Sequence, residues 1–467
     1  MAGEVMYIER EVYKSLINWK NSGEEPLLVE GARQVGKTYL VKKFAEDNFS
    51  TYLYIDMASN SGDSLLSLLN KHKSKNSNKE MLIKALIEFS SHFKDNSSTL
   101  VIIDEIQESY EVYNLIRSFN RECKWRFILI SSYLGRVSLD KKMWVSAGDL
   151  TKLEIKPLTF REFLKAVNSD VVFLFDTIDL YGNSPKEEYE FLKQYYNIYL
   201  RVGGYPKAVL KFLRDGDITE VYKYHEELLE TFAFESTKYL GSPLFKTLIM
   251  KSFSTFTYML LNEKKGLKHN NFAEQANKLE KNISYNLGGL NLNKEQYSKL
   301  LFWLIESHCL STCDKVVECD LGNIIGNQRY YFYDLGVFSF MLYKLKLDDS
   351  ASIGALNENY VNNVLRNKEF QPAFTTFANN EIDFIVKDFE SIYGIEVKSG
   401  KNSGISVEKA YKKGLIDKII YLKRDTYGGV DGNKLTIPIY LFERFEFKVN
   451  KDYFSKDTLK KLIKFNQ

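Results

Sequence analysis

The segment Gly31-Ala-Arg-Gln-Val-Gly-Lys-Thr38 constrains the fold of this chain more than any other feature. It lies between the apolar run 26–29, a predicted strand, and a predicted helix from Thr38 to about Glu46. Gly31 and Gly36 allow a tight turn whose N–H groups face a phosphate, Lys37 reaches the β/γ-phosphate oxygens, and Thr38 offers a hydroxyl to Mg²⁺. The pattern predicts a nucleoside triphosphate site. The expected contact residues are Gly31, Ala32, Arg33, Gln34, Val35, Gly36, Lys37, Thr38 and Tyr39.

A second element of such a site follows at Leu100-Val-Ile-Ile-Asp-Glu-Ile-Gln107. Four consecutive apolar residues suit a strand that is covered on both faces of a parallel sheet. Asp104, at the end of this strand, would bind Mg²⁺, and Glu105 would orient and deprotonate the attacking water. Together with the upstream loop, this pair predicts hydrolysis of ATP and not binding alone.

The next predicted strand, at 125–131, ends in hydroxyl residues. Ser131 or Ser132 would lie beside the γ-phosphate as a polar sensor, and a plain turn at the strand end is the competing interpretation. Since predicted strands alternate with helices, residues 1–155 are expected to form a doubly wound α/β domain with its ligand at the carboxyl ends of the strands. The expected strands are 27–30, 51–56, 100–104, 125–131 and 151–155.

Composition sets the broader limits. A chain of 467 residues is too long for one ordinary core, so we expect a multidomain α/β protein with two to four domains. The net charge of +3 does not by itself indicate a nucleic-acid partner. Four cysteines without zinc-binding spacing, no secretory signal and no long apolar run predict a reduced, cytoplasmic protein that does not span a membrane.

Four motifs carry a family resemblance. In chain order they are the 31–38 loop, Asp104-Glu-Ile-Gln107, Leu153-Glu-Ile-Lys-Pro-Leu-Thr-Phe-Arg-Glu-Phe-Leu164 and Gly203-Gly-Tyr-Pro206. They resemble the bacterial and archaeal AAA+ (STAND-like) ATPases that carry a nuclease-like C-terminal domain. The resemblance implies an AAA+ core over 1–155, a helical lid over 156–245 and a place for Pro206 near the adenine, with a simple turn as the alternative for 203–206.

One departure from the family pattern concerns an arginine. The family usually shows Gly-Arg just before the Pro-Leu-[ST]-Phe segment, whereas this chain has Gly148-Asp149. If that arginine normally stabilises charge in the transition state, this ATPase is slow, or Arg136 or an arginine of a partner chain replaces it. The sequence leaves these alternatives open.

Residues 246–335 are predicted to form a winged-helix-like connector. A strongly amphipathic helix at 293–306 is followed by two paired strands, at 310–319 and 328–333, which is the arrangement that the family shows here. Such a module binds DNA in the major groove or joins domains. Because the exposed face of this helix carries few basic residues, the joining role is favoured.

A second group of charged residues follows within 336–467. Ile382, Phe384 and Val386 are expected on one face of a strand, with Asp383 on the other, and the next strand places Glu396 and Lys398 on one face. Asp followed by Glu-x-Lys on an adjacent strand is the arrangement of PD-(D/E)xK phosphodiesterases, in which the two carboxylates would bind Mg²⁺ and the lysine would position the nucleophilic water. The competing interpretation is that each is a solvated charge on an exposed strand.

Glu358 lies in the apolar stripe of a predicted helix, on the face of Val361 and Leu365. A buried carboxylate needs a partner, and a metal site or a salt bridge to Lys398 would supply one. Glu381 is the alternative ligand. A helix at 406–416 and strands at 418–422 and 436–442 would complete a restriction-endonuclease-like fold.

The sequence therefore predicts an ATP-hydrolysing AAA+ protein, with Mg²⁺ as cofactor, coupled to a metal-dependent nuclease-like domain that acts on DNA. The expected catalytic residues are Glu105, Glu358, Asp383, Glu396 and Lys398, and the expected metal ligands are Thr38, Asp104, Asp383 and Glu396. The alternative is an ATP-dependent switch whose C-terminal domain binds nucleic acid or protein without cleavage. A homo-oligomer is a further candidate assembly.

Overall fold

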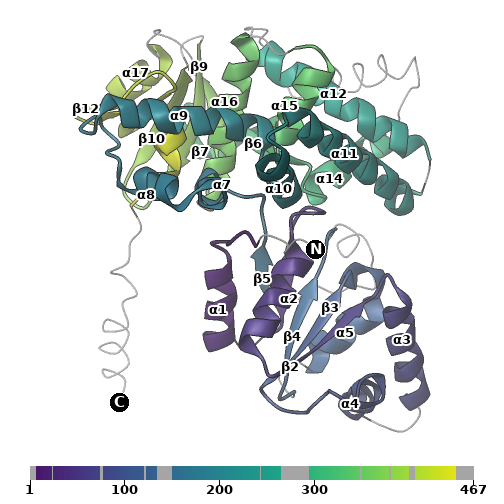
Figure 1. Ribbon diagram of the computed structural model, residues 1–467. Coiled ribbons are helices and arrows are strands. Elements are labelled where there is room, and N and C mark those ends of the chain that lie inside the picture. Colours follow the sequence, from purple (N-terminus) through teal and green to yellow (C-terminus); the bar gives the residue numbers. More distant parts are fainter. Residues whose placement is uncertain are drawn as a thin grey trace, which may run out of the picture.

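The computed structural model describes residues 7–23, 25–73, 77–119, 123–133, 150–241, 243–264, 294–347, 350–377, 380–398 and 405–448. In Figure 1 the chain forms two bodies, one built on the purple and blue N-terminal sheet and one that holds the teal helices and the green and yellow sheet. The segment after the last N-terminal strand leads from the first body to the second.

The first body contains a five-stranded sheet in the order β2-β3-β4-β1-β5, and each neighbouring pair of strands is parallel. The strands are β1 (Leu27–Glu30), β2 (Thr51–Asp56), β3 (Thr99–Asp104), β4 (Arg126–Ile130) and β5 (Thr151–Glu154). All residues of β3 are buried, as expected for a central strand covered on both faces. All five predicted strands are present within one or two residues of their predicted bounds.

Helices cover both faces of this sheet (Figure 1). They are α1 (Tyr13–Ser22), α2 (Lys37–Asn48), α3 (Asn60–His72), α4 (Asn78–Phe89) and α5 (Tyr110–Phe119), with a short 3₁₀ turn η1 at Ile106–Glu108. Leu100 and Ile102 of β3 join the core that includes α2, while Val101 and Ile103 join the core of α3, α4 and α5. The alternation along one strand therefore divides the apolar side chains between two layers.

A run of helices follows the first sheet, in agreement with the predicted helical segment. It contains α7 (Phe160–Val167), α8 (Ser169–Thr177), α9 (Lys186–Val202), α10 (Pro206–Asp215) and α11 (Ile218–Leu240). A capping box opens α7, because the Thr159 side chain accepts from the Glu162 N–H and the Glu162 side chain accepts from the Thr159 N–H. Pro206 occupies the first turn of α10, where its missing N–H costs no helical bond.

The second body holds an eight-stranded mixed sheet in the order β12-β13-β11-β10-β9-β8-β6-β7. The strands are β6 (Leu310–Val317), β7 (Asp320–Phe332), β8 (Ala373–Phe377), β9 (Asn380–Lys387), β10 (Ile392–Lys398), β11 (Lys418–Lys423), β12 (Gly429–Asp431) and β13 (Lys434–Pro438). The helices are α12 (Leu244–Lys264), α14 (Lys294–Glu306), α15 (Leu335–Lys344), α16 (Ser350–Asn367) and α17 (Ile405–Lys412), with 3₁₀ helix η3 at Ile439–Arg444.

The strands predicted for a wing are present as β6 and β7, but they extend the C-terminal sheet. Asp314 and Lys315 of β6 pair with Ala373 and Phe374 of β8 in parallel. One sheet therefore includes residues on both sides of the boundary predicted between 335 and 336. The prediction of a strand at 436–442 is wrong for residues 439–442, because β13 ends at Pro438 and the chain continues as η3. Pro438 lacks the N–H that would continue the ladder.

The faces of β9 also differ from the prediction. Ile382 packs with Ile385 in the small core beneath α17, whereas Phe384 and Val386 belong to the large core. The cause is a register shift against β8: Ala373 pairs with Ile385 but Thr375 pairs with Ile382, so two steps in β8 match three in β9. One extra residue reverses the alternation, as in a β-bulge.

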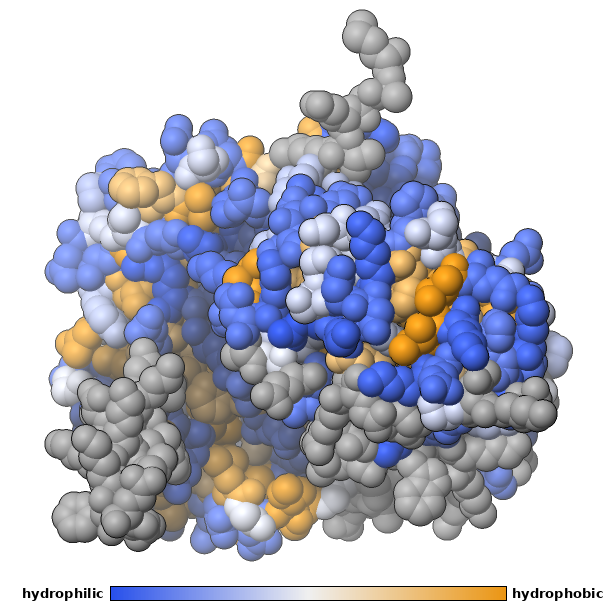
Figure 2. All heavy atoms as spheres, turned by 90° about the horizontal axis from the view of Figure 1, so that it is seen from below, coloured by the Kyte–Doolittle hydropathy of each residue, from blue (hydrophilic) through white to orange (hydrophobic). Residues whose placement is uncertain are grey.

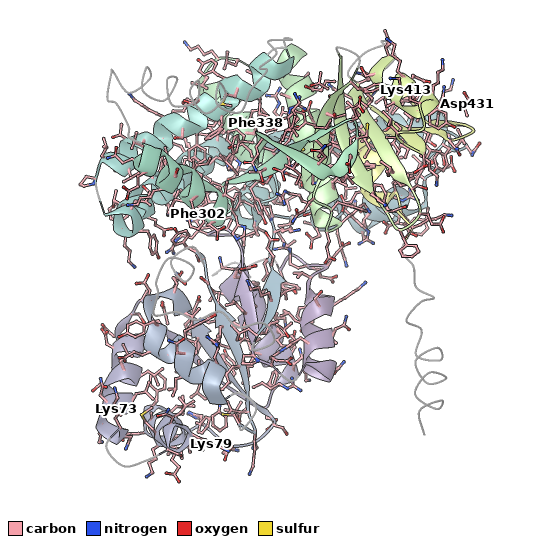
Figure 3. All side chains as sticks on the ribbon, turned by 180° about the vertical axis from the view of Figure 1, so that it is seen from behind. Lys73, Lys79, Phe302, Phe338, Lys413 and Asp431 are labelled. Atoms are coloured by element: carbon pink, nitrogen blue, oxygen red, sulfur yellow. The ribbon has the colours of Figure 1, made fainter. Side chains whose placement is uncertain are left out.

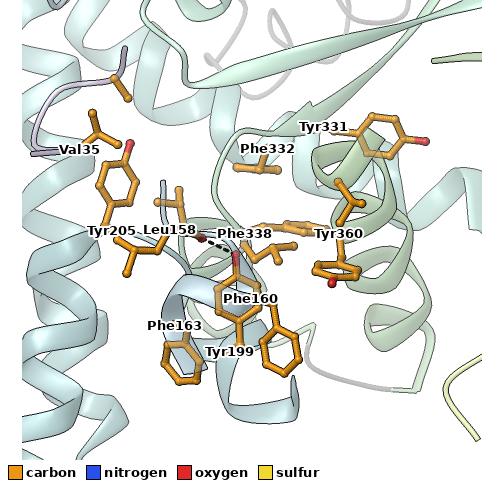
Figure 4. Packing of buried hydrophobic residues seen from close by; sticks show 14 of the residues in the cluster. Val35, Leu158, Phe160, Phe163, Tyr199, Tyr205, Tyr331, Phe332, Phe338 and Tyr360 are labelled. Atoms are coloured by element: carbon orange, nitrogen blue, oxygen red, sulfur yellow. Dashed lines mark hydrogen bonds between the residues drawn. The ribbon is translucent and has the colours of Figure 1, made fainter. Parts of the chain in front are cut away.

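A single hydrophobic core joins the phosphate loop, residues 31–38, to the second body. Figure 4 shows Val35 of the loop beside Tyr205 and Leu158, with Phe332 and Phe338 of the second body further along the same cluster. Tyr199 donates a hydrogen bond from its hydroxyl to the Leu158 carbonyl at 2.7 Å. A movement of the loop would therefore displace packed side chains in both bodies.

A cavity of about 510 Å³ lies between the bodies. Arg10, Lys152 and Lys156 line it from the first body, and Asn363 and Arg366 line it from the second. None of the loop residues 31–38 lines this cavity, so it is distinct from the predicted nucleotide site.

The face of the molecule seen from below is largely hydrophilic where described residues form it, with separate hydrophobic patches (Figure 2). Seen from behind, Lys73 and Lys79 lie in the first body, far from Lys413 and Asp431 at the outer end of the second (Figure 3). Among the helices of the described ranges, none is long and apolar enough to cross a membrane.

Candidate functional site

The phosphate loop has the backbone that its glycines predict. Gly31 and Gly36 have φ values of +144° and +93°, in the region that residues with a Cβ rarely adopt. A Cβ on Gly31 would also lie 2.2 Å from the Ile155 carbonyl oxygen. The loop therefore crosses the end of β5 closely, and α2 begins directly behind it at Lys37, so that the helix N-terminus faces the loop.

Lys37 is folded back into the loop. Its side chain is buried, and Nζ donates to the carbonyl oxygens of Gly31 and Ala32, each at 2.8 Å. Burial lowers the pKa of Lys37 to about 8, against the opposing effect of the nearby Glu105 and Asp104 carboxylates. An ammonium held by neutral loop carbonyls is available to phosphate oxygens at the same place.

Thr38 and Asp104 meet at the carboxyl end of β3. The Thr38 hydroxyl donates to Asp104 Oδ2 at 2.6 Å, and the Tyr54 hydroxyl donates to the same oxygen at 2.9 Å. A hydroxyl and a carboxylate beside a phosphate-binding loop are the oxygen donors that Mg²⁺ takes in nucleotide sites. The residues present therefore fit a Mg²⁺–nucleotide complex. Tyr54 was not predicted, although its strand position, two residues before Asp56, places it on β2 next to β3.

Glu105 follows Asp104 in a left-handed backbone conformation, with a φ of +50°. Both of its carboxylate oxygens have partners: Arg33 Nη1 lies 3.3 Å from Oε1, the Ser132 hydroxyl lies 3.3 Å from the same oxygen, and Gln107 Nε2 donates to Oε2. The Ser131 hydroxyl in turn donates to Gln107 Oε1 at 2.8 Å. Ser131 and Ser132 thus lie at the Glu105 side of the site, and Gln107 is a further member that the sequence analysis did not assign.

Arg33 extends from the loop to two carboxylates. Besides Glu105, it contacts Glu235 of α11 through its Nε atom. Its side chain stays 30% exposed. Helix α11 also contacts the 3₁₀ turn η1 that follows β3. Lys238 Nζ lies 2.7 Å from Glu108, and the Tyr239 hydroxyl donates to Glu108 at 3.0 Å. No sequence motif marked Glu235, which lies in a helix far along the chain from the loop.

The Gly203–Pro206 motif lies against the loop. Pro206 Cγ is the nearest atom, at 3.6 Å, to a Cβ built on Gly36. Behind the motif, the Gly204 N–H donates to Asp334 at 2.7 Å, and burial raises the pKa of Asp334 to about 6. This carboxylate also caps α15 by accepting from the Val337 N–H. The motif therefore connects the loop to the second body, and its predicted place near an adenine stays a prediction.

The residues that concern the missing family arginine lie outside the described ranges. Gly148, Asp149 and Arg136 all belong to 134–149.

In the second body, Asp383 and Glu396 lie on adjacent antiparallel strands. Phe384 pairs with Ile395, and continuing this antiparallel register by one step places Asp383, before Phe384, opposite Glu396, after Ile395. Asp383 Oδ2 accepts from the Val397 N–H at 2.8 Å, and Lys398 Nζ lies 2.6 Å from Glu396 Oε2. Both carboxylates are buried. Asp383, Glu396 and Lys398, which the sequence predicts as a site, thus lie on two strands that are neighbours in the sheet.

Glu358 is buried on α16, as predicted, and its contacts include side chains of β7. The Tyr331 hydroxyl donates to Glu358 Oε1 at 2.6 Å, and Arg329 Nη1 lies 3.3 Å from the same oxygen. Arg329 also contacts Glu381, the alternative ligand. Sequence analysis missed Arg329 and Tyr331, since both belong to a strand predicted for a different domain.

Within the described ranges, no group of three or more His, Cys, Asp or Glu side chains could hold a metal ion. Asp383 accepts from the Val397 N–H, Lys398 pairs with Glu396, and Glu358 and Glu381 both contact Arg329. The predicted metal-ligating role of Asp383 and Glu396 stays a proposal.

Comparison with known proteins agrees with a loop-based nucleotide site. Residues 23–164 match the sequence profile of the AAA domain family. No curated protein matches the chain. A Walker-type ATPase of Pyrococcus abyssi is a structural match with 15% identity and a TM-score of 0.43, over 72% of this chain and 96% of that one.

Two other solved structures are similar at lower scores. The ORC2 protein of Aeropyrum pernix, in ADPNP and ADP complexes, has 13% identity and a TM-score of 0.33, over 73% of this chain and 96% of its own. A STAND protein with a tetratricopeptide repeat sensor from Pyrococcus horikoshii has 14% identity and a TM-score of 0.29, over 78% and 46%. All three TM-scores are below 0.5.

The parallel sheet and the loop geometry thus define a P-loop nucleotide-binding fold. The match to the AAA domain family, over residues 23–164, includes the loop and all five strands of this sheet.

Proposed function

We propose that this protein binds ATP with Mg²⁺, hydrolyses it at the edge of the first sheet, and uses the nucleotide state to control the C-terminal domain. The observation that carries the proposal is the position of Lys37, whose Nζ lies 2.8 Å from two loop carbonyls, with Thr38 and Asp104 in contact at 2.6 Å beside it. An anion that enters the loop meets backbone N–H groups, this ammonium and the N-terminus of α2 together.

The chemical roles follow from these positions. Lys37 turns from the loop carbonyls to the β/γ-phosphate oxygens. Thr38 and Asp104 would hold Mg²⁺, which neutralises charge on the phosphates when bound. Glu105 orients a water molecule toward the γ-phosphorus and takes its proton, because it follows Asp104 at the same strand end.

The C-terminal domain is proposed to act on DNA as a metal-dependent nuclease. Support comes from two buried carboxylates on adjacent strands, Asp383 and Glu396, and from the 2.6 Å contact between Lys398 and Glu396. Two carboxylates and a lysine are the groups that metal-assisted hydrolysis of a phosphodiester uses.

A second candidate for this domain is binding without cleavage. It is favoured by the contacts of Arg329 with both Glu358 and Glu381, since a carboxylate that is held by an arginine is compensated without a metal. Under this candidate the ATPase acts as a switch for a domain that binds nucleic acid or protein.

The ATPase proposal is tested by measuring phosphate release from ATP with Mg²⁺ and with EDTA. Release that depends on Mg²⁺ is expected, and its absence at any nucleotide concentration would overturn the proposal.

Incubation of the full chain with plasmid and single-stranded DNA, with Mg²⁺ or Mn²⁺ and with or without ATP, separates the two candidates for the C-terminal domain. Metal-dependent cleavage that is lost in Glu396→Gln and retained in the surface variant Lys434→Gln supports the nuclease. DNA binding without cleavage supports the switch.

A further inference from the structure

Arg33 occupies the third position of the phosphate loop, between the site and two carboxylates. It lies 3.3 Å from Glu105, the residue proposed to orient the attacking water, and it also contacts Glu235. A guanidinium this close to the water-orienting carboxylate is also close to the place of the γ-phosphate. Because its side chain is 30% exposed, it can change partners without disturbing a core.

Another described arginine near the loop has a different role. Arg10 is buried and donates to the Val35 carbonyl at 3.2 Å and to the Lys156 carbonyl, and it pairs with Glu162 at 3.1 Å. These bonds fix the chain before α1 against the loop and against α7. Arg10 therefore holds structure together, whereas both partners of Arg33 are carboxylates at the site.

We infer that Arg33 is a catalytic residue that binds the γ-phosphate in cis during ATP hydrolysis, and that Glu235 of α11 is the positioning residue that holds Arg33 when the loop carries no phosphate. This inference rests on the proposed ATPase function and assigns the arginine that such a reaction uses. Arginine supplied to the γ-phosphate stabilises the charge that develops in phosphoryl transfer.

The exchange of partners has a chemical reason. Glu105 Oε1 accepts from the Ser132 hydroxyl and Oε2 accepts from Gln107 Nε2, while Arg33 forms an ion pair with Oε1 at 3.3 Å. A water molecule that donates to Oε1 therefore competes with the Arg33 guanidinium for this oxygen. When Arg33 moves to the γ-phosphate, one Glu105 oxygen loses its guanidinium partner and becomes available to the water.

The reaction then balances without any further reactant. The water oxygen bonds to the γ-phosphorus, its proton passes to Glu105, and the bond from the γ-phosphorus to the β,γ-bridging oxygen breaks. ADP leaves with the bond electrons, and Glu105 returns the proton to solvent or phosphate. Arg33 stays charged throughout and donates hydrogen bonds to the phosphoryl oxygens.

The same exchange frees α11. In the present state, Glu235 and the pair of Lys238 with Glu108 both tie this helix to the site edge. Loss of the Arg33 contact removes one of these ties when ATP binds. Helix α11 packs against α12 and α15, so its contacts lead to the second body.

The test compares Arg33→Ala and Arg33→Lys with the wild-type protein in two assays. We expect kcat for ATP to fall by about 10²- to 10³-fold in Arg33→Ala, with ADP affinity unchanged. Binding of ADP with aluminium fluoride, which mimics the transferring phosphoryl group, should fall by a similar factor. Arg33→Lys should restore part of both losses, because it keeps the charge but not the planar fork.

A second variant tests the positioning role. Glu235→Gln should raise the affinity for ADP with aluminium fluoride by about two- to fivefold, since Arg33 no longer has a competing partner. Glu230→Gln, an exposed position on the same helix, serves as the matched control and should have no effect. In the Arg33→Ala background, Glu235→Gln should also have no effect, which a general loss of structure would not produce.

The outcomes separate the two proposals. If the wild-type protein does not hydrolyse ATP, the proposed function and this inference both fail. If the wild-type protein hydrolyses ATP and Arg33→Ala has the same kcat and the same affinity for ADP with aluminium fluoride, only the inference fails. An equal effect of Glu235→Gln with and without Arg33 would overturn the role of Glu235.

Discussion

The buried charged side chains of the two sheets have different kinds of partner. In the first, Lys37 donates to two backbone carbonyls, and Thr38, Asp104 and Glu105 gather at the carboxyl ends of parallel strands. In the second, Arg329 meets Glu358 and Glu381, and Lys398 meets Glu396. The first arrangement has an ammonium ready for an external anion, whereas the second already pairs cations with carboxylates.

This difference follows from sheet topology. Parallel strands end at one edge, so polar residues that follow them converge whatever the details of packing. In the mixed sheet, convergence depends on register and on which strand lies next to which. The shift between β8 and β9 and the addition of β6 and β7 decide which side chains Glu358 and Glu381 meet.

The largest effect is expected from Lys37→Ala. The variant should lose ATP affinity by about 10³-fold, because the phosphates lose the only buried ammonium that the loop supplies. Equilibrium binding of a fluorescent ATP analogue measures this loss. Lys43→Ala, an exposed residue of the same helix, is the control and should bind normally. Wild-type affinity in Lys37→Ala would remove the contrast between the two sheets.

Glu105→Gln should separate binding from turnover. The amide keeps the shape of the side chain but cannot take a proton, so kcat should fall by about 10²- to 10³-fold while ATP affinity stays within a few-fold of wild type. Phosphate release and equilibrium binding on the same preparation provide the two values. Undiminished turnover would exclude Glu105 as the base.

Sequence reasoning predicted the first sheet well because each strand carries its own signal. Asp104 and Glu105 close an apolar run, and glycines mark the loop, so local patterns are sufficient there. Glu235, by contrast, is a helix residue in contact with Arg33 from a distant part of the chain, and no local pattern identifies such a pair. The capping box at Thr159 was predictable for the same reason as the loop: its two partners are three residues apart.

In the second sheet, sequence reasoning predicted that Glu358 is buried but not which side chains it contacts. The helical stripe correctly indicated a buried carboxylate at this position. Its contacts with Arg329 and Tyr331 depend on β7 joining the C-terminal sheet, which is a long-range pairing. The extra residue in β9 likewise depends on its partner strand, so alternation alone placed Ile382 on the wrong face.

Arg329→Met tests whether the second set of charges holds the fold. The change removes a buried guanidinium that contacts Glu358 and Glu381, so the free energy of unfolding should fall by about 3 kcal/mol. Urea unfolding, followed by tryptophan fluorescence, measures this change. Lys223→Met, which breaks an exposed pair with Glu220, should have almost no effect.

The same Arg329→Met variant can also reveal a metal site. If Glu358 and Glu381 act as metal ligands once Arg329 is removed, Mg²⁺ or Mn²⁺ should restore the stability of the variant and leave the wild-type protein unchanged. If stability is lost and metal has no effect, the cluster is an ion-pair network, as the second candidate function requires. A variant as stable as wild type would show that the pairs in the second sheet contribute little.

The smallest effect concerns the pH dependence of ATP binding at the first site. Burial lowers the pKa of Lys37 to about 8, and only the protonated ammonium attracts phosphate. ATP affinity should therefore be constant below pH 8 and fall by up to about tenfold per pH unit above it, until the pKa of the complex is reached. Phosphate raises that pKa because it favours the charged form. Titration calorimetry between pH 7 and 9.5 measures the slope, and Lys37→Arg, whose guanidinium stays protonated throughout, should flatten it. An equal slope in Lys37→Arg would assign the pH dependence to another group and would mean that the carbonyl-bound ammonium is not what distinguishes the first sheet from the second.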